Sequence, residues 1–330
     1  MEKAKLLVHP SPRFHGWIVL DKPVGLGSTT AVSAVKRILR GAGEPRTRVG
    51  HGGTLDPLAS GVLPIALGEA TKLAGRMLDA TKSYEFTIRF GEETDTLDAE
   101  GKVVATRDVR PTPEQVESVL PRFTGEIEQI PPAYSALKVG GKAAYARARA
   151  GEEVELKARK VTIPSLIIRH PELVSGSISP PAQGSPEWML KQVQHDVMEI
   201  TLAATVSKGT YIRSLARDIA RALGTVGHVS YLRRTRAGPF GLDQAVSLDF
   251  LTEIAKARQL TRAVLPLQAA LDDIPALPVT SRQAELLRHG QRLVGIPAPP
   301  GLQLATEEGT PVALVEASAD GLRVVRGFNL

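Results

Sequence analysis

The segment 49–68 constrains the fold of this chain more than any other, because it surrounds one charge with unusual backbone positions. It contains five glycines and two prolines, a content that predicts mostly turn rather than long helix or strand. Asp56 is its only carboxylate, and Pro57 biases it toward an extended backbone. The glycines permit backbone angles that other residues avoid. The segment therefore predicts an aspartate held stiffly among apolar side chains, although a solvated Asx-type turn is the commoner outcome for Asp-Pro.

Composition indicates a globular protein without thiol or metal chemistry. A chain of 330 residues with 42% apolar content can bury one large domain and a small one. No cysteine is present, and the seven histidines show no i, i+4 pair of the zinc-protease type, so we expect no protein metal site. The N-terminus lacks a signal-peptide core and no run reaches the roughly 18 apolar residues of a membrane span, which favours a soluble, cytoplasmic protein.

Positive charge is concentrated in two segments. The net charge is +6. Residues 1–60 hold nine Lys/Arg against four Asp/Glu, a net +5, and residues 208–238 hold seven against one, a net +6. The remainder is therefore −5. Such concentration fits a polyanion, most simply nucleic acid, although two solvated basic faces would give the same charges.

Apolar periodicity predicts a mixed α+β fold. A strand at 17–20 precedes a turn at 21–25, and Ser28 is expected to be the N-cap of a helix to about Arg40. Thr112, Pro113 and Gln115 predict a capping box. Further helices are expected at 69–78, 145–149, 211–223 and 249–258, and strands at 83–90, 161–168, 198–207 and 229–236. A Ser/Pro/Gly-rich stretch indicates an insertion at about 170–197. A boundary is expected at 272–278, before a compact β-rich tail.

Three individual residues each allow a functional and a purely structural interpretation. Tyr84 begins the apolar face of strand 83–90, so its ring is either a rim residue of the core or a surface on which a base stacks. Arg213 lies in the first turn of its helix, where the dipole disfavours a cation, so a partner carboxylate is expected and Asp56 is the candidate. The alternative is a solvent-exposed arginine. Lys22 in its turn either touches a phosphate or is simply solvated.

The ordered motifs of the chain resemble those of a known family. His51-Gly-Gly-Thr-Leu-Asp56-Pro-Leu-Ala-Ser-Gly61 resembles the catalytic motif of the TruB-type tRNA pseudouridine-55 synthases. Supporting blocks follow the family's order: 20–25, 82–84, 94–98, 131–138, 207–213 and 231–234. The resemblance covers about 16–270, and the insertion departs from it.

This resemblance implies a fold and a domain plan. The fold would be a mixed, largely antiparallel pseudouridine-synthase sheet flanked by helices, in a catalytic domain of residues 1–273. Residues 274–330 would form a small RNA-binding domain that is PUA-like. The substrate would be the T-arm and T-loop of tRNA, with no cofactor, metal, membrane or obligatory protein partner.

The resemblance also implies roles for individual residues. Asp56 would be the nucleophile, kept ionised and oriented by Arg213, and Tyr84 would stack on the uracil. Aspartate suits this role because it is ionised at neutral pH without an activating base. The residues implied to bind substrate are His51, which would help extrude the nucleotide, Tyr211 and Leu232 in the pocket, and Lys22 and Arg233 near phosphates.

Two other hypotheses stay open at this stage. A non-catalytic tRNA-binding or tRNA-folding protein could keep the fold and lose the chemistry, although the joint presence of Asp56, Tyr84 and Arg213 argues against it. A guide-RNA-dependent pseudouridine synthase shares these motifs but needs partner proteins. The residues do not distinguish attack on the sugar from initial loss of the base.

Overall fold

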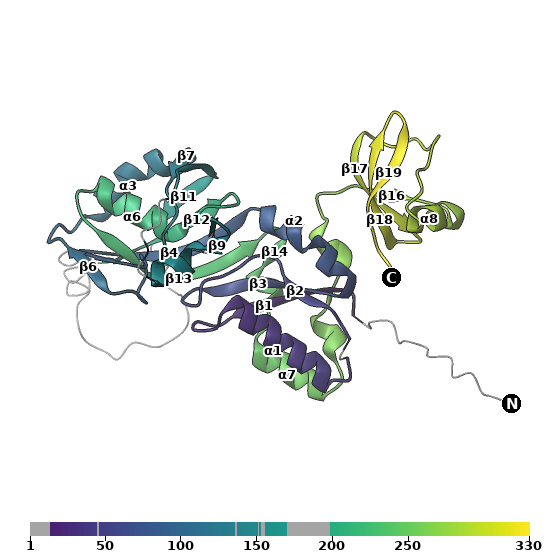
Figure 1. Cartoon of the computed structure of the whole chain (residues 1–330), viewed down its shortest axis with the longest axis horizontal. Helices are drawn as coiled ribbons and strands as arrows, with labels where there is room; N and C mark the ends of the chain where they lie inside the picture. The colour runs from purple at the N-terminus through teal and green to yellow at the C-terminus, as the bar shows by residue number, and fades with distance from the viewer. Residues whose placement is uncertain (1–13, 45, 136, 151, 153–155, 170–198) are drawn as a thin grey trace, which may run out of the picture. The chain divides into compact units, whose positions relative to one another are not determined.

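The computed structural model describes residues 14–330 except 45, 136, 151, 153–155 and 170–198, so the predicted insertion lies outside the described residues (Figure 1). The chain divides into two compact units. The first unit contains 1–57, 61–79 and 236–330, and the second contains 58–60 and 80–235. Each unit combines strands and helices, which confirms the predicted α+β class.

An antiparallel set of strands forms the centre of the first unit. The strand order is β3-β1-β15, with β2 paired to β3. Apolar residues of α1 and α7 pack with those of β1 and β3 in one buried cluster. The elements are β1 (Gly16–Lys22), α1 (Ser28–Gly41), β2 (Val49–His51), β3 (Ser60–Leu67), η1 (Gly68–Leu73), α2 (Ala74–Asp79), β14 (Phe240–Gly241), η3 (Leu242–Gln244), α7 (Leu248–Lys256), η4 (Leu260–Ala263), β15 (Leu265–Pro266) and η5 (Leu267–Ala270).

The predicted turn content of segment 49–68 is wrong for its second half. Residues 60–67 form β3, every residue of which is buried. The run from Val62 to Leu67 is uncharged and apolar, and this burial outweighs the local effect of Pro64. Pro64 is tolerated because β2 ends at His51, which pairs with Ile65, so the ladder with β2 requires no N–H at residue 64.

The second unit is built on the strand order β11-β12-β4-β13. β4 and β12 pair antiparallel from Lys82 opposite Val206 to Arg89 opposite Glu199. The predicted strand 161–168 is two strands that separate at Pro164, because β10 pairs with β7 and β11 with β12. The elements are β4 (Lys82–Phe90), β5 (Glu92–Thr94), β6 (Val103–Thr106), α3 (Pro113–Val119), η2 (Leu120–Phe123), β7 (Gly125–Gln129), β8 (Lys138–Val139), β9 (Lys142–Ala143), α4 (Ala144–Arg149), β10 (Arg159–Ile163), β11 (Ser165–Ile168), β12 (Glu199–Val206), α6 (Ile212–Ala222) and β13 (Gly227–Ala237).

The C-terminal residues make a β-rich module with its own core. Its four-stranded sheet has the order β16-β17-β18-β19, and α8 contributes Ala284 and Leu287 to the buried cluster. The strands are β16 (Ala276–Pro278), β17 (Gly301–Glu307), β18 (Thr310–Ser318) and β19 (Gly321–Gly327), and the helix is α8 (Ser281–Arg288). The β-rich tail is therefore confirmed, whereas the exact division at residue 273 stays a prediction.

A polar contact fastens the end of the chain to η1 within the first unit. Lys72 Nζ donates to Glu69 at 2.6 Å and to the carbonyl of Gly327 at 2.9 Å, while the backbone N–H of Asn329 donates to Glu69 at 2.8 Å. Partial burial acts to raise the pKa of Glu69, but these hydrogen bonds outweigh it and hold the pKa below its ordinary value. The last residues of the chain are thus tied to the helical turn that follows β3.

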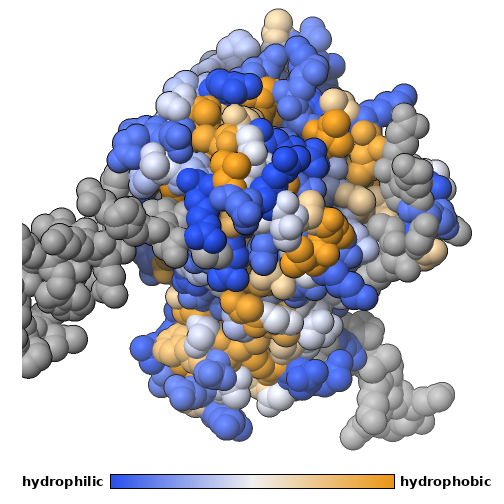
Figure 2. Space-filling model, turned by 90° about the vertical axis from the view of Figure 1, so that its left-hand side faces the viewer, coloured by the Kyte–Doolittle hydropathy of each residue, from blue (hydrophilic) through white to orange (hydrophobic). Residues whose placement is uncertain are grey.

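No helix among the described residues is long and apolar enough to cross a membrane. On the face drawn in Figure 2, hydrophobic residues are interspersed with hydrophilic ones.

Candidate functional site

Both neighbours of Asp56 are fastened to the segment that joins β1 to α1. On one side, Ser28 Oγ donates to the carbonyl of Leu55 at 2.9 Å and accepts from its N–H at 2.8 Å. On the other side, the carbonyl of Pro57 accepts from the N–H of Gly25 at 2.8 Å and from Lys22 Nζ at 3.3 Å. The half-buried Asp56 therefore projects from a backbone anchored immediately before and after it.

This arrangement corrects the prediction that Ser28 caps α1. Gly27 is the N-cap and makes no side-chain cap hydrogen bond. The Ser28 hydroxyl is buried and is used for the Asp56 loop, which gives both its donor and its acceptor a backbone partner. Helix-capping preference is worth about 1 kcal/mol, so a pair of buried backbone groups that need partners can override it.

The structure also corrects the expectation for Lys22. The residue is completely buried, so it is neither a solvated turn lysine nor able to reach a phosphate. Its ammonium group donates to the carbonyls of Pro23 at 2.9 Å, Leu26 at 2.7 Å and Pro57 at 3.3 Å. Lys22 is therefore a buried structural residue whose hydrogen bonds join the β1–α1 connection to the Asp56 loop.

Glycines shape the same loop in two ways. Gly53 and Gly61 have φ values of 129° and 100°, as the sequence predicts for a backbone that other residues avoid. Gly52 is required for space instead, since a Cβ there would lie 2.6 Å from the Cβ of Met77. The half-buried His51 ends β2, and its Nδ1 accepts from the N–H of Gly53 at 3.3 Å, which leaves Nε2 as the protonated nitrogen in the neutral ring.

Arg213 lies in the second unit and has a carboxylate partner that the sequence analysis missed. Its Nη1 is 3.4 Å from Oδ2 of Asp98, and the two side chains are 6% and 4% exposed. The guanidinium also donates to the carbonyls of Thr96 at 2.8 Å and Tyr134 at 2.9 Å. Arg213 is therefore no exposed arginine, and an expected carboxylate does offset its unfavourable place in the first turn. Its pairing with Asp56 stays a prediction.

Asp98 is held in turn by its own loop. Oδ1 accepts from Thr96 Oγ1 at 2.6 Å and from the N–H of Glu100 at 3.1 Å. The preceding residue, Leu97, has a φ of 63°, a left-handed conformation that is costly for a branched side chain. The sequence analysis includes Asp98 only as part of the block 94–98 and assigns it no ion pair. The signal that was available is the sequence Thr96-Leu97-Asp98, which places a hydroxyl two residues before the carboxylate.

Tyr84 lies where the alternation of β4 predicts. Phe86, Ile88 and Phe90 on its face are buried, whereas Tyr84 itself is half-buried at the end of the row. The ring therefore has an accessible part that can stack on a planar group. Leu232 in β13 is buried at 6% exposure.

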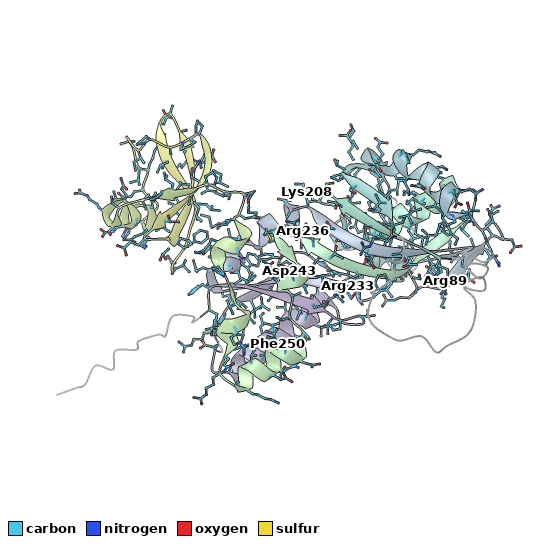
Figure 3. The ribbon with its side chains drawn as sticks, turned by 180° about the vertical axis from the view of Figure 1, so that it is seen from behind. Arg89, Lys208, Arg233, Arg236, Asp243 and Phe250 are labelled. Carbon is cyan, nitrogen blue, oxygen red and sulfur yellow. The ribbon has the colours of Figure 1, made fainter. Side chains whose placement is uncertain are left out.

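The arginines of β13 differ in their surroundings, although all three lie in the segment 208–238, whose positive charge is predicted to fit a nucleic acid. Arg234 is 1% exposed and cannot contact a phosphate, so the prediction is wrong for this residue. Arg233 is half-buried and its Nη1 donates to Ser60 Oγ at 3.3 Å, four residues after Asp56 in the chain. Arg236 is exposed (Figure 3).

Tyr211 is positioned by a buried glutamine that the sequence analysis did not single out. Gln129, at 1% exposure, accepts from the N–H of Tyr211 at 2.8 Å and donates to its carbonyl at 3.1 Å. The next residue, Ile130, also bonds to α6, because its carbonyl accepts a hydrogen bond from Ser214 Oγ at 2.8 Å. The guanidinium of Arg159 lies 4.8 Å from the centre of the Tyr211 ring. The first turn of α6, which carries Arg213, is thus clamped against the end of β7.

We expect Gln129→Met to impair catalysis by loosening this clamp. The change conserves shape but leaves the N–H of Tyr211 without its partner, so the free energy of unfolding should fall by about 1–3 kcal/mol. Activity on tRNA should fall at temperatures where the variant is still folded. Thermal melts and initial rates measure the two effects.

Gln303→Met is the matched control, because Gln303 is also buried, at 3% exposure, and donates to the carbonyl of Pro299 in the C-terminal module. The control should lose stability and keep its turnover rate; equal turnover by both variants would contradict the positioning role.

Comparison with known proteins gives consistent matches. Residues 36–179 match the model of the N-terminal domain of TruB family pseudouridylate synthases, and residues 213–272 match the C-terminal domain of tRNA pseudouridylate synthase B. The chain is 57% identical to tRNA pseudouridine synthase B of Zymomonas mobilis over 97% of its own length and 98% of that protein. It is 56% identical to the protein of the same name from Novosphingobium aromaticivorans, covering 96% and 97%.

A solved structure confirms the fold. The protein in an H/ACA RNP bound to a substrate RNA containing 2'-deoxyuridine superposes with a TM-score of 0.65 at 24% identity, covering 96% of this chain and 86% of that one.

Proposed function

The chain belongs to the TruB family of pseudouridylate synthases, and from that premise we propose that it converts uridine 55 in the T-loop of tRNA to pseudouridine, with Asp56 as the nucleophile. Its full-length relatives are named for pseudouridine formation in tRNA, and this chain isomerises a uridine of tRNA. The target position and the roles of individual residues are the parts that we propose.

The reaction is an isomerisation in which one bond is exchanged for another. The N1–C1′ glycosidic bond breaks, the uracil turns, C5 bonds to C1′ and loses its proton, and N1 gains a proton. No electrons are transferred to or from the substrate, and no outside group is added. The groups that the reaction requires are an anionic nucleophile, a surface that holds the detached base, and a means of extruding the nucleotide from its stack.

The single observation that carries the proposal is the double anchoring of the Asp56 loop. Ser28 fixes Leu55, and Lys22 with Gly25 fixes Pro57, so the backbone that carries the Asp56 carboxylate has little freedom to move. A solvated Asx turn would not require two buried polar side chains for its support. Holding a nucleophile in one orientation can lower a catalytic barrier substantially. This is a physical reason for buried polar side chains to support the loop of a nucleophile.

The roles proposed for the other residues are those that the family resemblance implies. The half-buried ring of Tyr84 would stack on the detached uracil, and Tyr211 and Leu232 would complete the base pocket. His51 would help extrude the nucleotide from its stack. Arg213, whose guanidinium is held by Asp98, would keep the Asp56 carboxylate ionised and oriented. Arg233 would contact a phosphate of the T-loop.

Activity of the purified chain alone tests the proposal. An unmodified tRNA transcript should gain pseudouridine at position 55 without any added RNA or protein, as detected by carbodiimide labelling and primer extension. A transcript with cytidine at position 55 should remain unmodified. Product only after addition of a guide RNA and partner proteins would favour a guide-dependent synthase, and binding without product would favour a tRNA-folding protein.

A further inference from the structure

A concave surface of the first unit carries a concentrated positive charge. A cavity of about 550 Å³ lies between the C-terminal half of α1, residues 44 and 46–50, and the residues at the junction of η1 with α2. Four of the lining residues are basic, namely Lys36, Arg40, Arg46 and Arg48, and Glu44 is the only acidic one. We call these four side chains and the cavity between them the basic pocket. Its lining carries a net charge of +3, which attracts anions into a concave surface.

Local structure explains only part of this charge. Lys36 and Arg40 lie one turn apart on α1, and Arg40 is in its last turn, where a cation is favoured by the helix dipole. Arg46 and Arg48 lie outside any helix, on either side of Thr47. All four basic side chains are exposed, and like charges gathered in one cavity repel one another, while Glu44 is the one acidic residue of the lining that can offset them.

Thr47 provides a second, independent observation. This residue lines the pocket and is 8% exposed, and within the described chain its hydroxyl has no hydrogen-bond partner. A buried hydroxyl without a partner destabilises the folded chain. As a lining residue of the pocket, Thr47 can offer this hydroxyl to an acceptor that enters from solvent. Exposed cations around a buried hydroxyl that can donate a hydrogen bond are the groups that bind a phosphate.

The position of the pocket connects it to the proposed reaction. Val49 and Gly50, which line it, belong to β2, and the next residue of that strand is His51. We infer that the basic pocket holds a backbone phosphate of the tRNA. This phosphate would lie near the target nucleotide in the RNA, because the pocket adjoins His51, the residue proposed to extrude that nucleotide. This inference rests on the proposed function, because it takes the RNA that carries the target uridine as the ligand. Phosphate contacts fix the register of a bound nucleic acid and contribute affinity without reading sequence.

A pair of double variants tests the pocket. Arg40→Gln with Arg48→Gln removes two cations from the basic pocket. Arg37→Gln with Lys256→Gln, the matched control, removes two exposed cations of α1 and α7 that do not line it. The affinity of each for an unmodified tRNA transcript is measured between about 50 and 200 mM KCl. We expect the pocket variant to bind about tenfold more weakly and with a log–log salt slope smaller by about 1–2, while the control stays within about twofold of wild type.

The outcomes separate this inference from the proposed function. Turnover at saturating tRNA should be unchanged in the pocket variant, and Arg40→Lys with Arg48→Lys should restore most of the affinity. Equal binding and equal salt slopes in the pocket and control variants would overturn the inference, even if a titration showed that inorganic phosphate binds the pocket. Failure of the wild-type chain to modify the same transcript would instead overturn the proposed function, whatever the binding of the variants.

Discussion

Asp56→Asn should abolish pseudouridine formation by the purified chain while leaving its affinity for tRNA within a few-fold of wild type. The amide is nearly isosteric with the carboxylate but cannot act as an anionic nucleophile, so the rate should fall by several orders of magnitude. Binding should persist because tRNA affinity is expected to come from phosphate contacts elsewhere. Release of tritium from C5-labelled uridine measures the rate, and filter binding measures the affinity. Equal activity of variant and wild type would end the assignment.

A second substitution at the same residue tests positioning separately from charge. Asp56→Glu keeps the negative charge but moves it by one methylene group. Because Leu55 and Pro57 are both anchored, the backbone cannot retreat to compensate. A displacement of this size should cost about 10²-fold in rate. Full activity of the glutamate variant would show that the anchors do not fix the nucleophile. Asp272→Asn, at an exposed aspartate, is a control that should change neither rate nor binding.

Arg213→Met should cause the second largest loss. The substitution leaves Asp98 as a buried carboxylate without its cation, and breaking such a pair costs about 3–5 kcal/mol. It also removes the donors to the carbonyls of Thr96 and Tyr134, which join two loops to the first turn of α6. We expect a fall in the melting temperature and a loss of activity of about 10²-fold or more in the fraction that remains folded. Thermal melts and single-turnover rates measure the two effects.

The same helix provides the control. Arg221 is paired with Glu93 at 3.0 Å, but its side chain is 57% exposed. Arg221→Met should therefore cost no more than about 1 kcal/mol. A cycle of Arg213→Met, Asp98→Asn and the double variant should give losses that are less than additive, because each single change already breaks the pair. Strict additivity would contradict the ion pair as the source of the effect.

The candidate site was predictable from the sequence where residue type alone fixes the chemistry. Asp56 is the sole carboxylate of a glycine-rich segment, and its motif occurs with the other family blocks in order. The half-buried position of Tyr84 followed from the alternation of a single strand, because the period of two assigns each side chain to a face. The helix of Arg213 and the need for a carboxylate partner followed from helix geometry.

Pairings between segments distant in sequence could not be predicted in this way. Local pattern assigned Ser28 to a helix cap and Lys22 to solvent, whereas both serve the Asp56 loop about 30 residues later. The partner of Arg213 is Asp98, 115 residues earlier, and no periodicity links the two. Gln129 resembles any other glutamine of a strand until Tyr211 is placed beside it.

The sequence by itself therefore determined the fold class, the family and the residue proposed as nucleophile, because periodicity and motif are properties of short segments. Only the tertiary structure decided which polar groups hold that residue and its companions in place. The physical reason is that a buried donor or acceptor must find a partner wherever the fold supplies one, and the nearest partner in space is seldom the nearest in the chain.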